Sequence, residues 1–313
     1  MLIAMRRFVS FAAIALLAAG CGDDAPGSER PVSAVATTGH VADLTRSVGG
    51  SRVDVRLLVP AGADPHGYEP RPSDARALAD SDAIVRSGGE VDEWLDDLLA
   101  SAGGGSAELT LLDQARVVDG DPHWWQDPRN ALRAVAAIRG LLARVDPAGR
   151  KMYELTAARY SRRLRQLDHS IATCMARVPP ARRKLVTAHD SYGYFARRYR
   201  IEVVGALLPS RSPQAQPSAK ETVELAERIE REGVAAIFPE TGSSSRLERA
   251  VAREAGVPLG RRLLADSLGP AGSAGETYIG AMSVDAAAMA EGFSAGRVRC
   301  RPGIRRAASR RAR

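Results

Sequence analysis

The sequence predicts an α/β fold with two Rossmann-like lobes joined by one long helix. Short β-branched runs alternate with helical patterns in the first half of the chain, and the same alternation returns in the second half. Between the halves, residues 147–178 contain no proline after Pro147 and a single glycine, near the start, which is typical of one continuous helix. The 313 residues, of which 45% are hydrophobic and 26% charged, suffice for two globular domains.

The first lobe is expected to span residues 31–146. Its strands and helices alternate in chain order: strand 32–38, helix 40–50, strand 53–60, helix 72–82 and strand 83–89. The glycine-rich stretch SAGGGSAE at residues 101–108 predicts a flexible surface loop. A further helix is expected from about Pro128 to Val145, because Asp146-Pro147 ends it.

The joining helix is expected over residues 147–178, and the second lobe over residues 179–296. This lobe repeats the rhythm four times, as strands followed by helices at 184–189 and 190–199, 201–208 and 217–233, 235–240 and 243–256, and 258–266 and 276–293. Repeated strand–helix units favour a largely parallel sheet in each lobe.

The N-terminus predicts an export signal over residues 1–20. Arg6 and Arg7 precede an apolar run that is too short for a permanent membrane anchor. Small residues then lead to Cys21, so that Ala18-Ala19-Gly20-Cys21 resembles a bacterial lipobox in which Cys21 is lipidated. The alternative is ordinary secretory cleavage with a free Cys21. Residues 21–30 follow as a polar linker.

The formal charge of +7 belongs to the two ends of the chain. Removing Arg6, Arg7 and the eight arginines of residues 297–313 leaves 34 basic residues against 37 acidic ones. Neither this body nor any motif supports nucleic-acid binding. The basic tail at 297–313 is expected to be disordered and solvated.

The two remaining cysteines, Cys174 and Cys300, form an even pair in an exported chain. Because the exported compartment is oxidising, we expect one disulfide that holds the C-terminal end to the middle of the chain. Two unpaired buried thiols are the alternative.

The tripeptide Asp-Pro-His occurs twice, at His66 and at His123, in a chain with only five histidines. Both of them, together with His189 and Asp266, follow the C-terminal ends of predicted strands, two in each lobe. Ligands of open α/β sheets bind at that edge, so a cleft between the lobes would gather all four. Three imidazoles and a carboxylate suit a divalent transition metal.

Other residues near these four also have predicted roles. Glu69 and Asp190 are expected to accept hydrogen bonds from His66 and His189. The alternative that His66 and His123 are ordinary surface residues stays open, because Asp-Pro begins many surface turns. His169 is expected to be solvated, His40 to begin a helix and Trp124-Trp125 to pack in the core.

At these residues the sequence resembles the substrate-binding lipoproteins of bacterial zinc and manganese ABC importers, the TroA/ZnuA-like family. The matching segments run in family order and cover most of residues 32–293: TTGHVADLTRSVGG, ADPHGYEPRPSD, GDPHWWQDPRNA, LVTAHDSYGYFARRY, IFPETGSSSRLERAVAREAGVPLG and ADSLGP. The resemblance implies two α/β lobes, one rigid helix and a metal between the lobes. It places the four ligands on His66, His123, His189 and Asp266.

The resemblance also implies what the protein does. A histidine at the third ligand place, here His189, is the choice of zinc-binding members, whereas manganese binders tend to have glutamate. We therefore expect a monomeric, extracytoplasmic receptor, lipid-anchored to the membrane, that captures Zn²⁺ and delivers it to an ABC permease with its ATPase. Mn²⁺ or Fe²⁺ is the alternative cargo.

Two other classes were weighed against this receptor. A zinc hydrolase would use the three histidines as ligands and Glu240 as general base, but Asp266 would close the open position that catalysis needs. Within a receptor, Glu240 is a further candidate to support a ligand. The third class is a lipoprotein adhesin with a structural metal. We expect a binding protein and not an enzyme.

Overall fold

Two parallel β-sheets organise the part of the chain that the computed structural model describes, which is residues 30–303 except 104, 117–119, 209 and 212–216. In the first lobe the strand order is β2-β1-β3-β4, and in the second lobe β5 pairs with β6; every pairing is parallel. The strands are β1 (Val32–Ala36), β2 (Val53–Leu57), β3 (Ala83–Arg86), β4 (Ala107–Thr110), β5 (Lys184–Thr187) and β6 (Glu202–Ala206).

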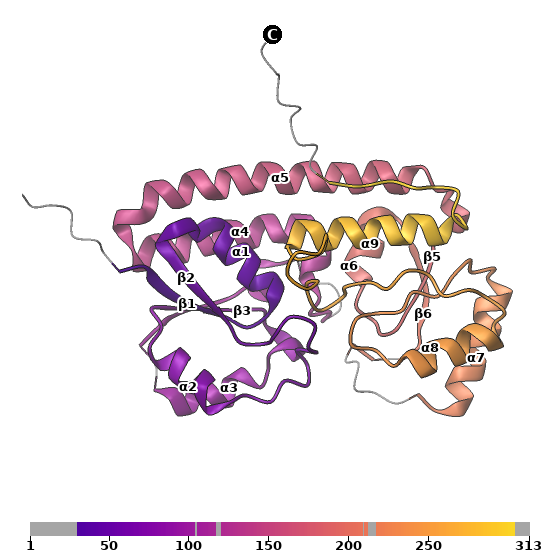
Figure 1. Ribbon diagram of the computed structural model, residues 1–313, viewed down its shortest axis with the longest axis horizontal. Coiled ribbons are helices and arrows are strands. Elements are labelled where there is room, and N and C mark those ends of the chain that lie inside the picture. Colours follow the sequence, from indigo (N-terminus) through magenta and orange to yellow (C-terminus); the bar gives the residue numbers. More distant parts are fainter. Residues whose placement is uncertain (1–29, 104, 117–119, 209, 212–216, 304–313) are drawn as a thin grey trace, which may run out of the picture. The chain divides into compact units, whose positions relative to one another are not determined.

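Helices surround both sheets (Figure 1). They are α1 (Gly39–Gly49), α2 (Pro72–Ala79), α3 (Leu95–Ala102), α4 (Pro128–Val145), α5 (Arg150–Ala176), α6 (Gly193–Tyr199), α7 (Ala219–Arg231), α8 (Ser245–Glu254) and α9 (Tyr278–Phe293). Helix α4 has the predicted bounds, because Asp127 accepts a hydrogen bond from the backbone N of Arg129 at 2.8 Å and Pro128 occupies the first turn.

The long helix differs slightly from its predicted span. Residues Pro147–Gly149 form a 3₁₀ turn, and α5 then runs for 27 residues. Buried side chains recur every three or four positions along it, including Tyr160, Leu164, Leu167 and Ile171. This stripe packs against α1 and α4 and also against α6 and α9 (Figure 1). Its residues belong to a hydrophobic core that includes residues of β1, β2 and β3 in the first lobe and Leu185 of β5 in the second.

The cysteine prediction is confirmed by a disulfide between Cys174, near the end of α5, and Cys300, with 5.9 Å between their Cα atoms. The link closes 126 residues of chain. Loop closure of this length restricts the unfolded chain and so favours the folded state.

Three predictions of local structure were wrong, two for strands of the second lobe and one for a loop of the first. Residues 235–240 and 258–266 form isolated parallel bridges, such as Thr187 with Phe238 and Glu240 with Leu263, instead of regular strands. Pro239 explains part of this, since it has no N–H to donate to a ladder. In the first lobe, residues 101–108 are not a single loop, because α3 continues to Ala102 and β4 begins at Ala107.

The chain ends carry predictions that lie outside the described residues: the signal peptide, Cys21, the linker up to residue 29 and residues 304–313 of the basic tail. Across residues 30–303, apart from the gaps, no helix is both long enough and apolar enough to cross a bilayer.

Candidate metal centre

The four predicted ligand residues come together in the structure. His66, His123, His189 and Asp266 each offer an atom that lies within 4.8 Å of the others. His66 lies in the loop after β2 and His123 just before the 3₁₀ turn Trp124–Gln126, whereas His189 follows β5 and Asp266 follows the bridge at Leu263. Each lobe therefore supplies two of them, as the sequence predicts.

The geometry fits a cation. From the carboxylate oxygens of Asp266, the Nε2 atoms of His189, His123 and His66 lie 3.0, 3.5 and 3.6 Å away. The histidine side chains are at most 2% exposed and that of Asp266 is 10% exposed. None of the three Nε2 atoms has a hydrogen-bond partner of good geometry. Buried polar atoms without partners are costly, and a bound metal would satisfy all of them.

The space beside these residues is small. A cavity of about 10 Å³ is lined by His189, Asp266, Glu240 and residues of the adjoining loops. A volume of this order is near the minimum that holds one water molecule, so little space is left beside His189 and Asp266.

His123 is oriented by Asp121, the first residue of its own Asp-Pro-His turn. The Oδ1 atom of Asp121 lies 2.7 Å from Nδ1 of His123 and also accepts from the His123 backbone N at 2.9 Å. Both side chains are buried. An acceptor at Nδ1 holds the proton there and leaves the Nε2 lone pair free for a metal. We had not predicted this role for Asp121, although the doubled tripeptide contains the signal.

His189 is in contact with Glu240, the residue expected to support a ligand. Oε2 of Glu240 bonds to Nδ1 of His189, and Oε1 accepts from the backbone N of Ala188 at 3.1 Å. Glu240 is 1% exposed. Its backbone is held in turn by Ser243, whose hydroxyl donates to the Glu240 carbonyl at 2.6 Å, and by Arg262.

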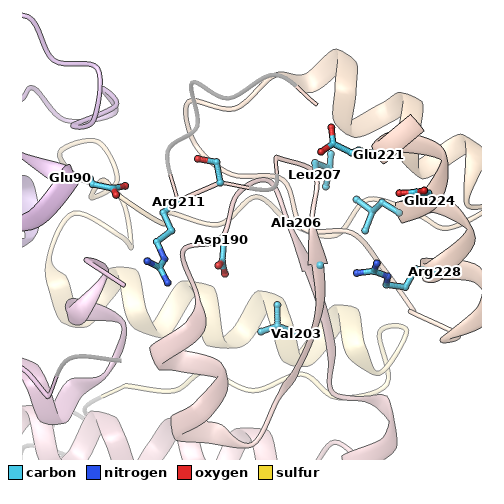
Figure 2. Close-up of a pocket in the computed structure, with 12 residues that line it drawn as sticks. Glu90, Asp190, Val203, Ala206, Leu207, Arg211, Glu221, Glu224 and Arg228 are labelled. Carbon is cyan, nitrogen blue, oxygen red and sulfur yellow. The ribbon is translucent and has the colours of Figure 1, made fainter. Parts of the chain in front are cut away.

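The expected contacts of Glu69 and Asp190 were wrong. Glu69 is exposed, and neither ring nitrogen of His66 has a hydrogen-bond partner. His66 is positioned through its backbone instead, because its N donates to Asp64 at 2.9 Å. Asp190 is exposed and lines a surface cavity of about 630 Å³ beside β6 and α7 (Figure 2), and the partner at Nδ1 of His189 is Glu240 instead.

Comparison with known proteins identifies the family. The family model for the periplasmic zinc-uptake complex component A, ZnuA, matches residues 34–292. The chain belongs to this family. Its members are substrate-binding proteins of metal ABC importers and not enzymes.

Relatives of this ZnuA-family chain cover almost its whole length. The manganese-binding lipoprotein MntA of Halalkalibacterium halodurans is 28% identical, over 90% of this chain and 96% of MntA. The manganese ABC transporter substrate-binding lipoprotein PsaA of Streptococcus pneumoniae is 24% identical, over 89% and 94%. The solved periplasmic zinc-binding protein TroA of Treponema pallidum superposes with a TM-score of 0.79 at 25% identity, over 85% of this chain and 99% of TroA. This similarity confirms the fold class.

The charges in this ZnuA-family site are strongly coupled. Burial opposes ionisation of Asp266, but the neighbouring imidazoles, His189 first, outweigh it and lower the pKa of this carboxyl. Burial would likewise lower the pKa of His189, yet Asp266 and Glu240 raise that pKa well above its usual value. Burial lowers the pKa of His66. Without a metal, the stable arrangement is therefore a protonated His189 facing an ionised Asp266.

His40 is a neighbour of the site. As predicted it lies at the start of a helix, but it is 2% exposed and stacks on Trp125 with 5.1 Å between ring centroids. Burial lowers its pKa to about 4, so the ring is neutral at pH 7. A sequence signal existed, because His40 follows β1 at the same sheet edge as the ligand loops. Trp124 and Trp125 are fully buried, as expected, and His169 is exposed.

Proposed function

We propose that the protein binds Zn²⁺ through Nε2 of His66, His123 and His189 and a carboxylate oxygen of Asp266, and delivers it to an ABC permease. The observation that carries the proposal is the convergence of three buried, unpartnered imidazole nitrogens on one carboxylate. Zinc accepts four ligands of this kind in tetrahedral geometry.

The donor set favours zinc over manganese. Mn²⁺ prefers oxygen ligands, and this group offers one carboxylate against three nitrogens. Manganese is nevertheless the second candidate, because the relatives MntA and PsaA carry it in their names. Four protein ligands disfavour a zinc hydrolase, which needs an open water position at the metal.

The remaining features of the proposal follow from the family. We infer a monomer that is anchored outside the cytoplasm through lipid on Cys21 and that works with a permease and its ATPase. Residues 66 and 123 lie on one lobe and residues 189 and 266 on the other, so separating the lobes would pull the ligands apart and release the ion. Because α5 packs on both lobes, small movements are expected.

The test begins with metal analysis of the purified protein and calorimetric competition between Zn²⁺ and Mn²⁺. His189→Ala should weaken zinc binding by at least about 100-fold, since it removes a ligand outright. His169→Ala is the matched control, because His169 is an exposed histidine on α5, and its zinc affinity should equal that of the wild type. Unchanged affinity in a folded His189→Ala protein would refute the site, and stronger binding of Mn²⁺ than Zn²⁺ would favour the second candidate.

A further inference from the structure

The loop that carries Asp266 is held by two donors from the opposite lobe. Nε1 of Trp125 donates to the backbone carbonyl of Ala265 at 2.9 Å, and Nε2 of Gln126 donates to the same oxygen at 3.1 Å. Trp125 is 0% exposed and Gln126 is 1% exposed. Both donors lie in the 3₁₀ turn that directly follows His123. Residues 123–126 therefore contain the ligand residue His123 of the first lobe and also donate two hydrogen bonds to Ala265, which precedes Asp266 of the second lobe.

The gripped carbonyl belongs to the peptide bond between Ala265 and Asp266. Because a peptide unit is planar, fixing the carbonyl oxygen of Ala265 also fixes the positions of the N and Cα atoms of Asp266. From the other side, the N of Ala265 donates to the hydroxyl of Tyr192 at 3.0 Å, and Tyr192 donates to Asp285 at 2.8 Å. Ala265 is thus held by the second lobe at its N–H and by the first lobe at its carbonyl.

Trp125 is itself firmly placed. Its indole stacks on His40 at 5.1 Å and meets the edge of the His123 ring at 5.4 Å. Its backbone carbonyl accepts from the hydroxyl of Tyr278, in α9, at 2.7 Å. The indole N–H has little freedom to seek another acceptor, so the bond to Ala265 is specific to this arrangement of the lobes.

We propose that Trp125 and Gln126 form an interlobe latch, which positions Asp266 and slows release of the bound metal. The proposal rests on the metal site proposed above. Because both donors follow His123 in one turn, any displacement of that turn from the second lobe moves His123 and breaks the two bonds to Ala265 together. Asp266 then loses its backbone constraint as the ion loses a histidine. The latch residues are positioning residues, since neither offers an atom to the ion.

Trp124 provides a matched control. It adjoins Trp125, is also 0% exposed, and also donates its indole N–H to a backbone carbonyl, that of Ser87 at 3.2 Å. That acceptor lies in the first lobe, directly after β3, so the bond does not cross between lobes. Trp124→Phe and Trp125→Phe therefore remove the same chemical group at equal burial, and only the second substitution opens the latch.

The experiment is a chelator chase of Zn²⁺-loaded protein, followed by stopped flow. Trp125→Phe should raise the zinc dissociation rate by about 10-fold or more, the size of effect found for groups that orient metal ligands. Trp124→Phe should leave that rate near the wild-type value, and the association rate should change little in either variant. Both substitutions should lower the melting temperature of the metal-free protein, which thermal unfolding measures. If only Trp125→Phe also speeds zinc dissociation, the faster release reflects lost positioning of Asp266 and not lost stability.

Gln126→Leu tests the same idea without removing an aromatic ring. Its Oε1 atom has no hydrogen-bond partner, so the substitution removes the donor and little else. It should also speed dissociation, and it decides the matter if Trp125→Phe does not fold. Equal dissociation rates in Gln126→Leu, Trp124→Phe and the wild type would overturn the latch. A wild-type protein that binds no zinc in calorimetry would instead refute the proposed function.

Discussion

Hydrogen bonds hold two of the four site residues at the side chain and the other two at the backbone. His123 and His189 each have a carboxylate at Nδ1, from Asp121 at 2.7 Å and from Glu240. His66 and Asp266 have no such partner within the described structure. Instead, the carbonyl of the residue before each of them accepts an indole N–H at 2.9 Å: Pro65 from Trp94, and Ala265 from Trp125. Each lobe contributes one residue to each pair.

The two kinds of brace serve different ends. A carboxylate at Nδ1 fixes the tautomer and makes Nε2 a better metal donor. A backbone brace fixes the position of the main chain from which the side chain extends and does not act on the ligand atom itself. We infer that the ring-braced pair, His123 and His189, provides affinity, and that the backbone-braced pair, His66 and Asp266, governs how readily the ion leaves. The predictions below test the ring-braced pair, and the chelator chase of Trp125→Phe and Gln126→Leu tests the backbone brace of Asp266.

Among the changes that leave all four ligand residues in place, the largest effect is expected from Glu240→Gln. Oε1 of Glu240 accepts from the backbone N of Ala188, so a glutamine that keeps this bond must turn its amide NH₂ toward Nδ1 of His189. An NH₂ group donates to Nδ1 and moves the imidazole proton to Nε2, where it blocks the metal. Zinc affinity measured by calorimetry should fall by about 100-fold.

The protein should remain folded, because glutamine has nearly the same shape as glutamate. A Glu240→Gln variant that binds zinc as tightly as the wild type would show that the carboxylate does not set the tautomer of His189. It would also refute the inference that a carboxylate at Nδ1 gives His123 and His189 their role in affinity.

The second effect is the pH dependence of zinc binding. The pKa of His189 is raised well above its usual value, so in the metal-free protein this ring carries a proton that zinc must displace. Affinity therefore falls as pH falls, by up to about tenfold per pH unit below that pKa. Metal-free stability changes in the opposite direction, because a raised histidine pKa stabilises the fold below the unfolded value and the gain is lost as pH rises through the folded one.

Calorimetry in buffers of different ionisation enthalpy would report about one proton released from His189 per zinc ion. Burial lowers the pKa of His66, so this ring contributes less to proton release than His189 does. Affinity that does not change between pH 7.5 and 6 would contradict a protonated His189.

Much of this structure was readable from sequence because it depends on local patterns. The bounds of α4 follow from Asp127-Pro128 at one end and Asp146-Pro147 at the other. The alternation of strands and helices places His66 and His189 at the same kind of sheet edge. The same reasoning failed for residues 235–240, where apolar composition predicts a strand but Pro239 leaves only bridges. Pairing depends on neighbours from distant parts of the chain, which a local pattern does not contain.

The supporting residues were harder to predict than the ligand residues. Glu69 and Asp190 were chosen because they are close in sequence to His66 and His189, yet both are exposed. Glu240 is 51 residues from His189, and Trp125 is 140 residues from Ala265, so their contacts are set by packing. Asp121 was missed although its contact is local, because an aspartate two residues before a histidine can bond back to it through a turn.

The smallest effect is expected from Asp121→Asn. Asp121 uses a single oxygen, Oδ1, for both the ring and the backbone of His123, so asparagine can keep both bonds with its carbonyl oxygen. Only the negative charge is lost, and zinc affinity should fall by about tenfold, less than for Glu240→Gln. Glu69→Gln makes the same charge change on an exposed residue and should leave affinity unchanged. If Asp121→Asn cost as much as Glu240→Gln, charge at Nδ1 and not the tautomer would control the ring-braced pair, because charge is the one property that both substitutions remove.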